Sequence, residues 1–532
     1  MNAQNLSDYP YVSRRRVVMG KRCAVATSQP LATLAGMEMF WAGGNAVDAA
    51  IATAIALTVV EPTSNGIGSD AFALVWDGKL HGLNASGRSP QNLSLEAFAG
   101  MEQVPSCGWL PVTVPGVVSA WASLSQRWGK LPFEQLFEPA IRYAEEGFPV
   151  SPVTAEAWKR AEAIYLPLTA PEFQPFKEVF FPRNRAPAVG EVWGSEAHAK
   201  TLRAIAQSGG ESFYKGEIAS LIADFAASTN GYLTTTDLAA HTADWVEPIS
   251  TNYRDLTVWE IPPNTQGIAT LMALNILEGI NINQYPRESV ERYHLQIEAM
   301  KLAFADVNRH VTDPRFMEVA VEQLLDKAYA KERQQLIGEQ AILLAKFGLP
   351  KGGTVYLAAA DSELMVSFIQ SNYEGFGSGI LVPGTGIALQ NRGVGFTLEA
   401  GHPNQLAPAK RSFHTIIPGF LTRGNQPLGP FGVMGGQMQP QGHLQVVINM
   451  ADYDMNPQAA LDAPRWRFIE GKTVLLEEKV PHQIALELAA RGHDIQISKE
   501  ESSFGRGQII LHREGVLIAA SEPRADGLAL AQ

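Results

Sequence analysis

The residues best suited to chemistry lie between Lys351 and Gly379, where two glycines precede Thr354 and a strand-like run follows. A threonine hydroxyl is a weak nucleophile unless a base lies beside it. Cleavage between Gly353 and Thr354 would give Thr354 a free α-amine, whose ordinary pKa of roughly 8 suits proton transfer near neutral pH. Glycine before this bond lets the backbone bend until Oγ reaches the preceding carbonyl. These residues predict a self-cleaving amidase with an N-terminal threonine nucleophile.

Thr354 begins the first of two strands that we expect to form a hairpin. The runs 354–361 and 364–371 are both strand-like, and Ser362-Glu363 fits a two-residue turn between them. This register places Thr354 opposite Ser371, about 5 Å away between Cα atoms. The Ser371 hydroxyl could then hydrogen-bond the nucleophile, although ordinary solvent-facing hydroxyls would give the same pattern.

Two later segments offer groups that acyl transfer needs. Gly435 and Gly436, in GVMGG, provide adjacent backbone N–H groups without side-chain obstruction, as an oxyanion hole requires, although glycine pairs also mark turns. The run PAKRSFHTIIPG brings basic and hydroxyl side chains together, among them His414 and Thr415. These side chains could bind an acidic acyl group.

Other catalytic patterns are weaker in this chain. The sequence has no G-x-S-x-G, H-E-x-x-H, P-loop or C-x-x-C motif. His294 and Glu298 share one face of an expected helix and could hold a metal, but no third ligand is evident, so a packing pair is expected. The two cysteines, Cys23 and Cys107, are expected to be buried thiols. No cofactor or metal is expected.

The composition favours a soluble protein that acts on small molecules. The 532 residues carry a net charge of -12 and are 46% apolar, which is ordinary for a chain that buries a large core. No long basic run occurs, so neither nucleic acid nor a membrane is an expected partner. Arg14, Arg15 and Arg16 are not followed by the apolar region of a signal peptide. We therefore expect a cytoplasmic protein.

The elements that must position these residues follow from the apolar patterns. Residues 29–40 and 45–59 are expected to be helices, and 71–76 and 80–84 to be strands. The region 117–345 is mainly helical in pattern, most clearly at 299–307 and 321–347, whereas short strand-like runs predominate from Thr354 onward. No flexible linker divides the chain, so the change of pattern at 351–354 is its one strong boundary.

Segments spread along nearly the whole chain carry a likeness to a known family. They are, in order, GGNAVDAA, VVEPTSNGIGSDAF, VPGVVSAW, GKLPFEQLFEPAIRYAEEGFPV, EAMKLAFADVNRHVTDPRF, GGTVYLAAAD, FGSGILVPGTGIALQN, KRSFHTIIPG and GVMGGQMQPQGH. Together they resemble the γ-glutamyltranspeptidase family of N-terminal nucleophile hydrolases. The resemblance implies an α/β (α+β) fold, a four-layer αββα sandwich that forms a single interwoven domain.

The resemblance also implies how the chain is processed and what it does. Autocleavage would give a large subunit, 1–353, and a small subunit, 354–532, and would allow a dimer of these heterodimers. Thr354 would be the nucleophile, Ser371 the hydroxyl that supports it, and Gly435 and Gly436 the oxyanion hole. The implied reaction is hydrolysis or transfer of a γ-glutamyl group, as in glutathione, through an acyl-enzyme.

The chain departs from the family pattern where the substrate is recognised. Ser86 takes the place of an arginine that binds the γ-glutamyl carboxylate, with Arg88 two residues later, and Gly395 takes the place of the acid that holds the α-ammonium. Loss of a charge-assisted hydrogen bond of about 1.5–3 kcal/mol implies roughly ten- to hundredfold weaker recognition. Arg88 is the candidate for the acyl carboxylate. The other candidates for substrate binding are Asn372, Tyr373, Arg392, His414 and Thr415.

Three functions therefore remain open at the level of sequence. The first is the γ-glutamyl chemistry of the family. The second is hydrolysis of a mono-amide of a dicarboxylic acid without an α-amino group, as in the related glutaryl-cephalosporin acylases and oxamate amidohydrolases. The third is an uncleaved, non-catalytic binding protein.

Overall fold

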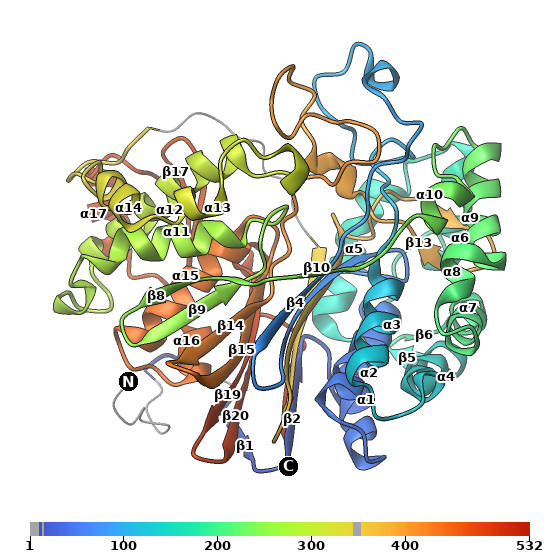
Figure 1. The fold of residues 1–532 in the computed structure, drawn as a ribbon, viewed down its shortest axis with the longest axis horizontal. Helices are drawn as coiled ribbons and strands as arrows, with labels where there is room; N and C mark the ends of the chain where they lie inside the picture. Colours follow the sequence, from blue (N-terminus) through green and yellow to red (C-terminus); the bar gives the residue numbers. More distant parts are fainter. Residues whose placement is uncertain (1–9, 13–14, 344–352) are drawn as a thin grey trace.

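The chain forms four layers, with two β-sheets face to face and helices outside each of them (Figure 1). The structure is a computed structural model that describes residues 10–12, 15–343 and 353–532. Because both sheets draw strands from the first and the last third of the chain, the two predicted subunits share one body. The expected αββα sandwich is confirmed.

The first sheet carries the predicted nucleophile on its third strand. All of its pairings are antiparallel. Its strands, in spatial order, are β21 (Leu528–Ala531), β2 (Cys23–Thr27), β10 (Gly353–Asp361), β11 (Met365–Tyr373), β3 (Asp70–Trp76), β4 (Leu80–Ala85) and β7 (Asp244–Val246).

The second sheet packs against the first through a buried apolar layer that includes Phe72, Tyr356, Ile369, Phe420 and Ile510. Such a layer removes apolar surface from water and fixes how the two sheets lie. The strands of the second sheet, in spatial order, are β1 (Val18–Gly20), β20 (Val516–Ser521), β19 (Arg506–Arg513), β15 (Gln426–Met434), β14 (Gly419–Arg423), β9 (Leu256–Glu260) and β8 (Ile249–Tyr253).

Helices cover the outer face of each sheet. α2 is buried along its whole length against β10 and β11, and its small alanines allow this close approach. Asn45 caps the first turn of α2 in a capping box with Asp48. The helices that pack on the first sheet include α1 (Pro30–Trp41), α2 (Ala46–Val60) and α3 (Val117–Trp128), and α4 (Glu138–Glu146) packs on α2. Those on the second sheet include α11 (Gly267–Glu278), α15 (Met438–Ala451) and α16 (Pro457–Asp462), and α12 (Val290–His310) packs on α11.

The remaining elements form the periphery. A small third sheet contains β16 (Trp466–Glu470), β17 (Thr473–Glu477) and β18 (Asp494–Ser498). The other helices are α5 (Pro152–Tyr165), α6 (Gln174–Phe180), α7 (Glu196–Gln207), α8 (Glu211–Lys215), α9 (Glu217–Ser228), α10 (Thr235–Ala239), α13 (Val321–Leu324), α14 (Lys327–Gln334) and α17 (His482–Ala490). The short strands are β5 (Phe148–Pro149), β6 (Val192–Trp193), β12 (Leu381–Val382) and β13 (Ile387–Ala388). Among the described helices, none is both long enough and apolar enough to cross a bilayer.

The predicted early helices and strands are confirmed within two residues, whereas the long helix predicted at 321–347 is wrong. α13 ends at Leu324, and Asp326 caps the next helix, α14, because its side chain accepts from the N–H of Tyr329. The non-helical residues 335–343 follow, and 344–347 lie outside the described residues. The mainly helical region 117–345 also contains β7, β8 and β9, and helices α15, α16 and α17 lie within the region predicted as short strands.

Candidate active site

Thr354 lies near the start of β10, only 2% exposed, with its hydroxyl beside that of Ser371. Its Oγ1 donates to Ser371 Oγ at 3.1 Å. The hairpin keeps the predicted register from Val355 opposite Gln370 onward, with an irregularity between Gly353 and Val355. The predicted pairing of the two hydroxyls is confirmed, and both are buried rather than solvent-facing.

The Ser371 hydroxyl is the centre of the hydrogen bonds around Thr354. Besides the Thr354 hydroxyl, it accepts from the main-chain N–H of Tyr373 at 2.8 Å and from Nη2 of Arg392 at 3.0 Å. It donates to the main-chain carbonyl of Gly353 at 2.6 Å. Ser371 therefore connects the predicted nucleophile with the carbonyl that the nucleophile would attack during autocleavage.

Arg392 is a buried cation without a carboxylate hydrogen-bond partner among the described residues. It belongs to the short helix Arg392–Gly395 and is 1% exposed. Its guanidinium donates to Ser371 and to Thr415 Oγ1, the latter at 2.8 Å, and lies 4.2 Å from the centre of the Tyr373 ring. Its Nε has no partner in the described structure. Burial lowers the pKa of Arg392 to about 10, so it stays charged at neutral pH.

His414 and Asp70 form a buried pair behind Ser371. Asp70 is the cross-strand partner of Ser371 on β3, and its Oδ2 lies 3.2 Å from His414 Nε2. Burial raises the pKa of Asp70 to about 7, although Arg392 acts in the opposite direction. Burial also lowers the pKa of His414 well below its usual value, an effect to which Arg392 adds. His414 therefore contacts Asp70 as a neutral imidazole.

Two candidates for substrate binding lie away from the nucleophile. Asn372 accepts from the hydroxyl of Ser69 at 2.8 Å and donates to a main-chain carbonyl, so its side chain organises a neighbouring loop. Arg88 pairs with Asp313 at 2.8 Å. Although burial alone would raise it, hydrogen bonds from Arg315 hold the pKa of Asp313 at about 2, so Arg88 has a firmly ionised partner. None of the six predicted substrate-binding residues, Tyr373, Arg392, His414 and Thr415 included, is among those that line the cavity at Thr354.

Gly435 and Gly436 connect β15 to α15 next to this cavity. Their φ angles, +125° and +62°, lie in the region that favours glycine. The carbonyl of Gly436 accepts from Gln266 Nε2 at 2.9 Å, which fixes the orientation of this turn. Gly435 lines the cavity together with Thr354. The turn can therefore present main-chain N–H groups toward a bound carbonyl.

A cavity of about 590 Å³ opens at Thr354, and five charged residues are among those that line it. Sequence reasoning missed its charged residues because they come from segments far apart in the chain. They are Arg160, Glu374, Arg467, Glu500 and Arg506. Cys107, half-buried rather than buried as predicted, also lines the cavity, whereas Cys23 is buried.

Glu374 is the one charged lining residue with a signal in the sequence, because it directly follows Tyr373. Its Oε2 accepts from Asn391 Nδ2 at 2.9 Å, and Asn391 Oδ1 accepts from the main-chain N–H of Glu374. Burial raises the pKa of Glu374 above its usual value. Glu374 thus places a fixed carboxyl group in the cavity that Thr354 also lines.

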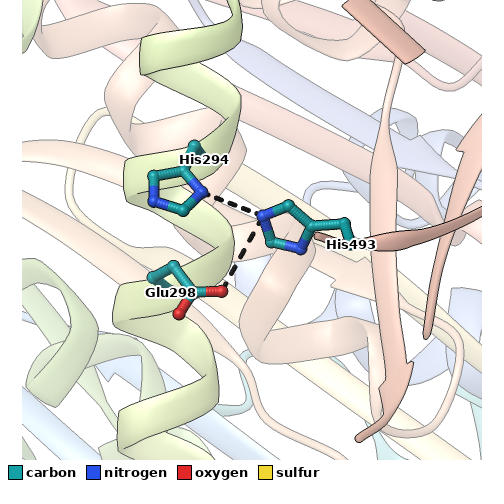
Figure 2. Close-up of side chains that lie close together, drawn as sticks. All are labelled: His294, Glu298 and His493. Carbon is teal, nitrogen blue, oxygen red and sulfur yellow. Dashed lines mark hydrogen bonds and ion pairs between the residues drawn. The ribbon is translucent and has the colours of Figure 1, made fainter. Parts of the chain in front are cut away.

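The pair His294 and Glu298 does gain a third potential metal ligand, His493, which the sequence did not reveal (Figure 2). The imidazoles lie 2.9 Å apart, between Nδ1 of His294 and Nε2 of His493. However, the buried ammonium of Lys301 donates to Glu298 Oε1 at 2.7 Å, and the N–H of Ile342 donates to Oε2 at 2.9 Å. A metal ion would compete with this ammonium, so the expected packing role fits the contacts better.

Comparisons with known proteins agree with this architecture. A family model described as Gamma-glutamyltranspeptidase matches residues 32–532. The crystal structure of cephalosporin acylase from Bacillus halodurans is similar, with a TM-score of 0.95 and 57% identity over 99% of this chain and 98% of that one. The chain is 36% identical to the Glutathione hydrolase-like YwrD proenzyme of Bacillus subtilis, over 96% of this chain and 99% of that protein. It is 33% identical to the Oxamate amidohydrolase proenzyme of Klebsiella pneumoniae, over 94% and 96% of the two chains.

Proposed function

This chain is an enzyme of the gamma-glutamyltranspeptidase family, and from that premise we propose that it hydrolyses mono-amides of dicarboxylic acids whose acyl chain has no α-ammonium group. The proposed enzyme forms by cleavage between Gly353 and Thr354, which gives subunits 1–353 and 354–532. The related proenzymes and the similar cephalosporin acylase support this processing and this class of substrate.

Ser371 can relay a proton during the proposed self-cleavage. Thr354 Oγ1 attacks the carbonyl carbon of Gly353 while its proton passes to Ser371 Oγ. Ser371 gives its own proton to the Gly353 carbonyl oxygen, which already accepts its hydrogen bond. The O–H proton of this intermediate then passes through Ser371 to the Thr354 nitrogen, so that the carbonyl forms again as the amide C–N bond breaks and the amine becomes free. Water hydrolyses the resulting ester. The guanidinium of Arg392 stabilises negative charge on this relay.

The processed enzyme would use the same hydroxyl on the substrate. The new α-amine of Thr354 accepts the Oγ1 proton as Oγ1 attacks the substrate carbonyl. Main-chain N–H groups of Gly435 and Gly436 stabilise the tetrahedral oxyanion, and the leaving amine departs with the proton. Water, activated by the Thr354 amine, then hydrolyses the acyl-enzyme and releases the diacid.

The observation that carries the choice of acyl group is the unpaired charge of Arg392. A buried guanidinium beside the nucleophile, held by two hydroxyls and an aromatic ring, is suited to an acyl carboxylate and unsuited to an ammonium group. We therefore assign to Arg392, with Thr415 in support, the role that the sequence gave to Arg88, since Arg88 already has Asp313. His414 supports Arg392 indirectly through Asp70.

Glu374 favours a second candidate, the γ-glutamyl chemistry of the family. Its carboxyl group lines the cavity with Thr354 and could replace the acid that is missing at Gly395. It would then bind the α-ammonium of a γ-glutamyl amide such as glutathione. The raised pKa of Glu374, which burial causes, weakens this assignment because the ionised form is the one that binds ammonium.

Kinetics with three anilides separate the two candidates. We expect glutaryl-4-nitroanilide to be cleaved with a kcat/KM at least tenfold above those of γ-glutamyl-4-nitroanilide and butyryl-4-nitroanilide. The ratio of kcat/KM for the glutaryl over the butyryl substrate measures how much the acyl carboxylate contributes. The ratio for the glutaryl over the γ-glutamyl substrate measures the effect of the α-ammonium. A tenfold preference for the γ-glutamyl substrate would reject the proposal in favour of the family's default reaction.

Gel electrophoresis of the purified protein tests the processing and the non-catalytic alternative. Wild type should give two bands of the proposed subunit sizes, and Thr354→Ala should give one band and no activity, because alanine has no hydroxyl to attack the Gly353 carbonyl. Thr354→Ser is the matched control and should be cleaved, because it keeps the hydroxyl. A single wild-type band without amidase activity would indicate a binding protein.

A further inference from the structure

One part of the cavity lining consists of charged and polar side chains that could bind a group of the substrate. It is formed by Arg467 of β16 and by Glu500, Ser503 and Arg506 at and before the start of β19. Arg392, by contrast, is not among the residues that line this cavity. A substrate amide has an acyl side and an amine side on either side of the carbonyl that Thr354 would attack. If the acyl side, here called the acyl arm, extends toward Arg392, the amine side, or amine arm, can extend toward Arg467.

Arg467 is the residue of this lining whose charge lacks an ion pair. It is 8% exposed, and its Nη1 donates to the main-chain carbonyl of Ser503 at 3.0 Å. Its Nε has no hydrogen-bond partner among the described residues, which also provide no carboxylate within ion-pair distance. Burial lowers the pKa of Arg467, and the charge of Glu500 only partly opposes this. The guanidinium is thus buried, charged and incompletely bonded.

The other cavity arginines differ from Arg467. Arg506 has Glu61 at 3.6 Å, and Arg160 has Glu156 at 2.8 Å and Glu500 at 4.0 Å. Arg160 is also exposed to solvent at 41% of its side chain. An anion entering the cavity would therefore gain most from Arg467, because the other two charges are already partly compensated.

We propose that Arg467 binds an anionic group, most simply a carboxylate, on the leaving amine of the substrate. The amine product would then be an amino acid or an aminocarboxylate rather than a neutral amine. The inference rests on the proposed function only for placing the acyl arm toward Arg392. A guanidinium–carboxylate contact would use the Nη groups of Arg467, since the residue lines the cavity while its Nε is itself buried.

A matched pair of leaving amines tests this subsite. Amides of 4-aminobenzoate and of 4-aminobenzamide have nearly the same shape, but only the first carries a carboxylate. With one acyl group in common, wild type should cleave the 4-aminobenzoate amide with roughly tenfold higher kcat/KM, as one charge-assisted contact implies. Arg467→Gln should lower this ratio to about one and leave the 4-aminobenzamide substrate nearly unchanged.

Arg160→Gln is the matched control, because it removes a charge from the same cavity that already has carboxylate partners. We expect its ratio to stay within about twofold of wild type. Equal losses for both substrates in Arg467→Gln would indicate a purely structural role and would overturn the inference. So would a wild type that does not distinguish the two amines.

Two further measurements keep the test decisive. If Arg467→Gln does not fold or is not cleaved into subunits, inhibition of the wild-type enzyme by the two free amines tests the subsite instead. 4-Aminobenzoate should inhibit at roughly tenfold lower concentration than 4-aminobenzamide. Equal inhibition by the two amines would overturn the inference. The same amine pair can be attached to a γ-glutamyl group, so the subsite can stand when the proposed acyl preference fails. Conversely, if Arg467→Gln changes the glutaryl-to-butyryl ratio instead, Arg467 binds the acyl arm and this inference fails while the proposed function stands.

Discussion

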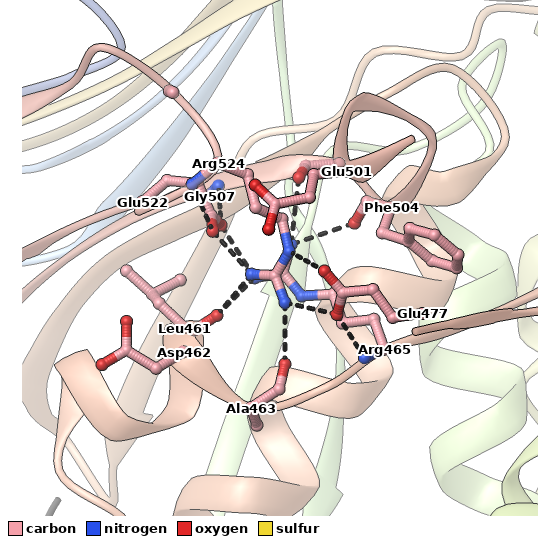
Figure 3. Close-up of polar contacts among 12 residues, drawn as sticks. Leu461, Asp462, Ala463, Arg465, Glu477, Glu501, Phe504, Gly507, Glu522 and Arg524 are labelled. Atoms are coloured by element: carbon pink, nitrogen blue, oxygen red, sulfur yellow. Dashed lines mark hydrogen bonds and ion pairs between the residues drawn. The ribbon is translucent and has the colours of Figure 1, made fainter. Parts of the chain in front are cut away.

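Two sets of buried arginines have opposite environments. In the first, Arg524 donates two hydrogen bonds to Glu477 and one to Glu522, and Arg465 donates to Glu522 at 2.8 Å (Figure 3). Although burial alone would raise them, these arginines hold the pKa values of both glutamates below their usual range. In this network, which we call the arginine–glutamate network, every charge has a partner of opposite sign.

The second set, Arg392 and Arg467, has no such partners. Arg467 lies only two residues from Arg465, and both contact main-chain carbonyls of the same loop, Arg467 at Ser503 and Arg465 at Phe504. Burial lowers the pKa of Arg392 and of Arg467, and that of Arg465 as well, so it is the ion pairs with carboxylates that distinguish the two sets. The difference indicates that the first set stabilises the fold, whereas the second leaves charge available for a ligand.

The largest expected effect comes from removing a charge from the arginine–glutamate network. Glu522→Gln leaves Arg465 without a carboxylate in the dry interior, and breaking such a pair costs about 3–5 kcal/mol of unfolding free energy. Urea denaturation, followed by tryptophan fluorescence, should show a much lower midpoint. Arg467→Met, on β16, is the control and should change the unfolding free energy by less than about 1 kcal/mol. Similar losses in the two variants would contradict the division into two sets.

The next effect concerns specificity rather than stability. Arg392→Gln removes the charge that we assign to the acyl carboxylate, so the ratio of kcat/KM for glutaryl- over butyryl-4-nitroanilide should fall roughly ten- to hundredfold. The ratio is the appropriate measurement, because Arg392 also bonds Ser371 and its loss can slow both substrates. Arg88→Gln is the matched control and should leave the ratio unchanged. A ratio that depends on Arg88 instead would restore the assignment made from sequence.

The hairpin of Thr354 and Ser371 could be predicted from sequence because the information is local. The glycines before Thr354, the alternating strands and the two-residue turn fix which residues face each other, and the Ser371 contact follows from that register. The long-range pairings could not be predicted in this way. Arg88 receives its partner Asp313 from the segment after α12, which no periodicity reveals.

The same reasoning explains the missed cavity lining and the wrong helix. Arg467 faces the cavity because a small third sheet places β16 beside residues 500–506, a tertiary arrangement without a sequence signal. The helix predicted at 321–347 followed the apolar pattern correctly up to residue 324. Asp326, a good N-cap residue, was the available sign that a second helix begins there.

Asp70 extends the comparison from arginines to carboxylates. Burial raises the pKa of Asp70 to about 7 in the folded state, whereas the ordinary value of 3.8 applies to the unfolded chain. Between these values the unfolded chain loses its proton first, so the folded state loses stability as pH rises, at most by about 1.4 kcal/mol per pH unit. Below pH 3.8 both states are protonated, and above about 7 the loss is complete.

Asp70→Asn tests whether stability falls as pH rises, because the amide cannot titrate but can still accept a hydrogen bond from the main-chain N–H of Gly87. Thermal unfolding at pH 5 and pH 7.5 should show wild type losing stability relative to the variant as pH rises. His414 stays neutral across this range, because its pKa is lowered by burial, and Arg392 stays charged. If the stability of wild type and variant changes with pH in the same way, Arg392 keeps Asp70 ionised. The charge of the Arg392 guanidinium would then be partly balanced by a carboxylate, as in the arginine–glutamate network.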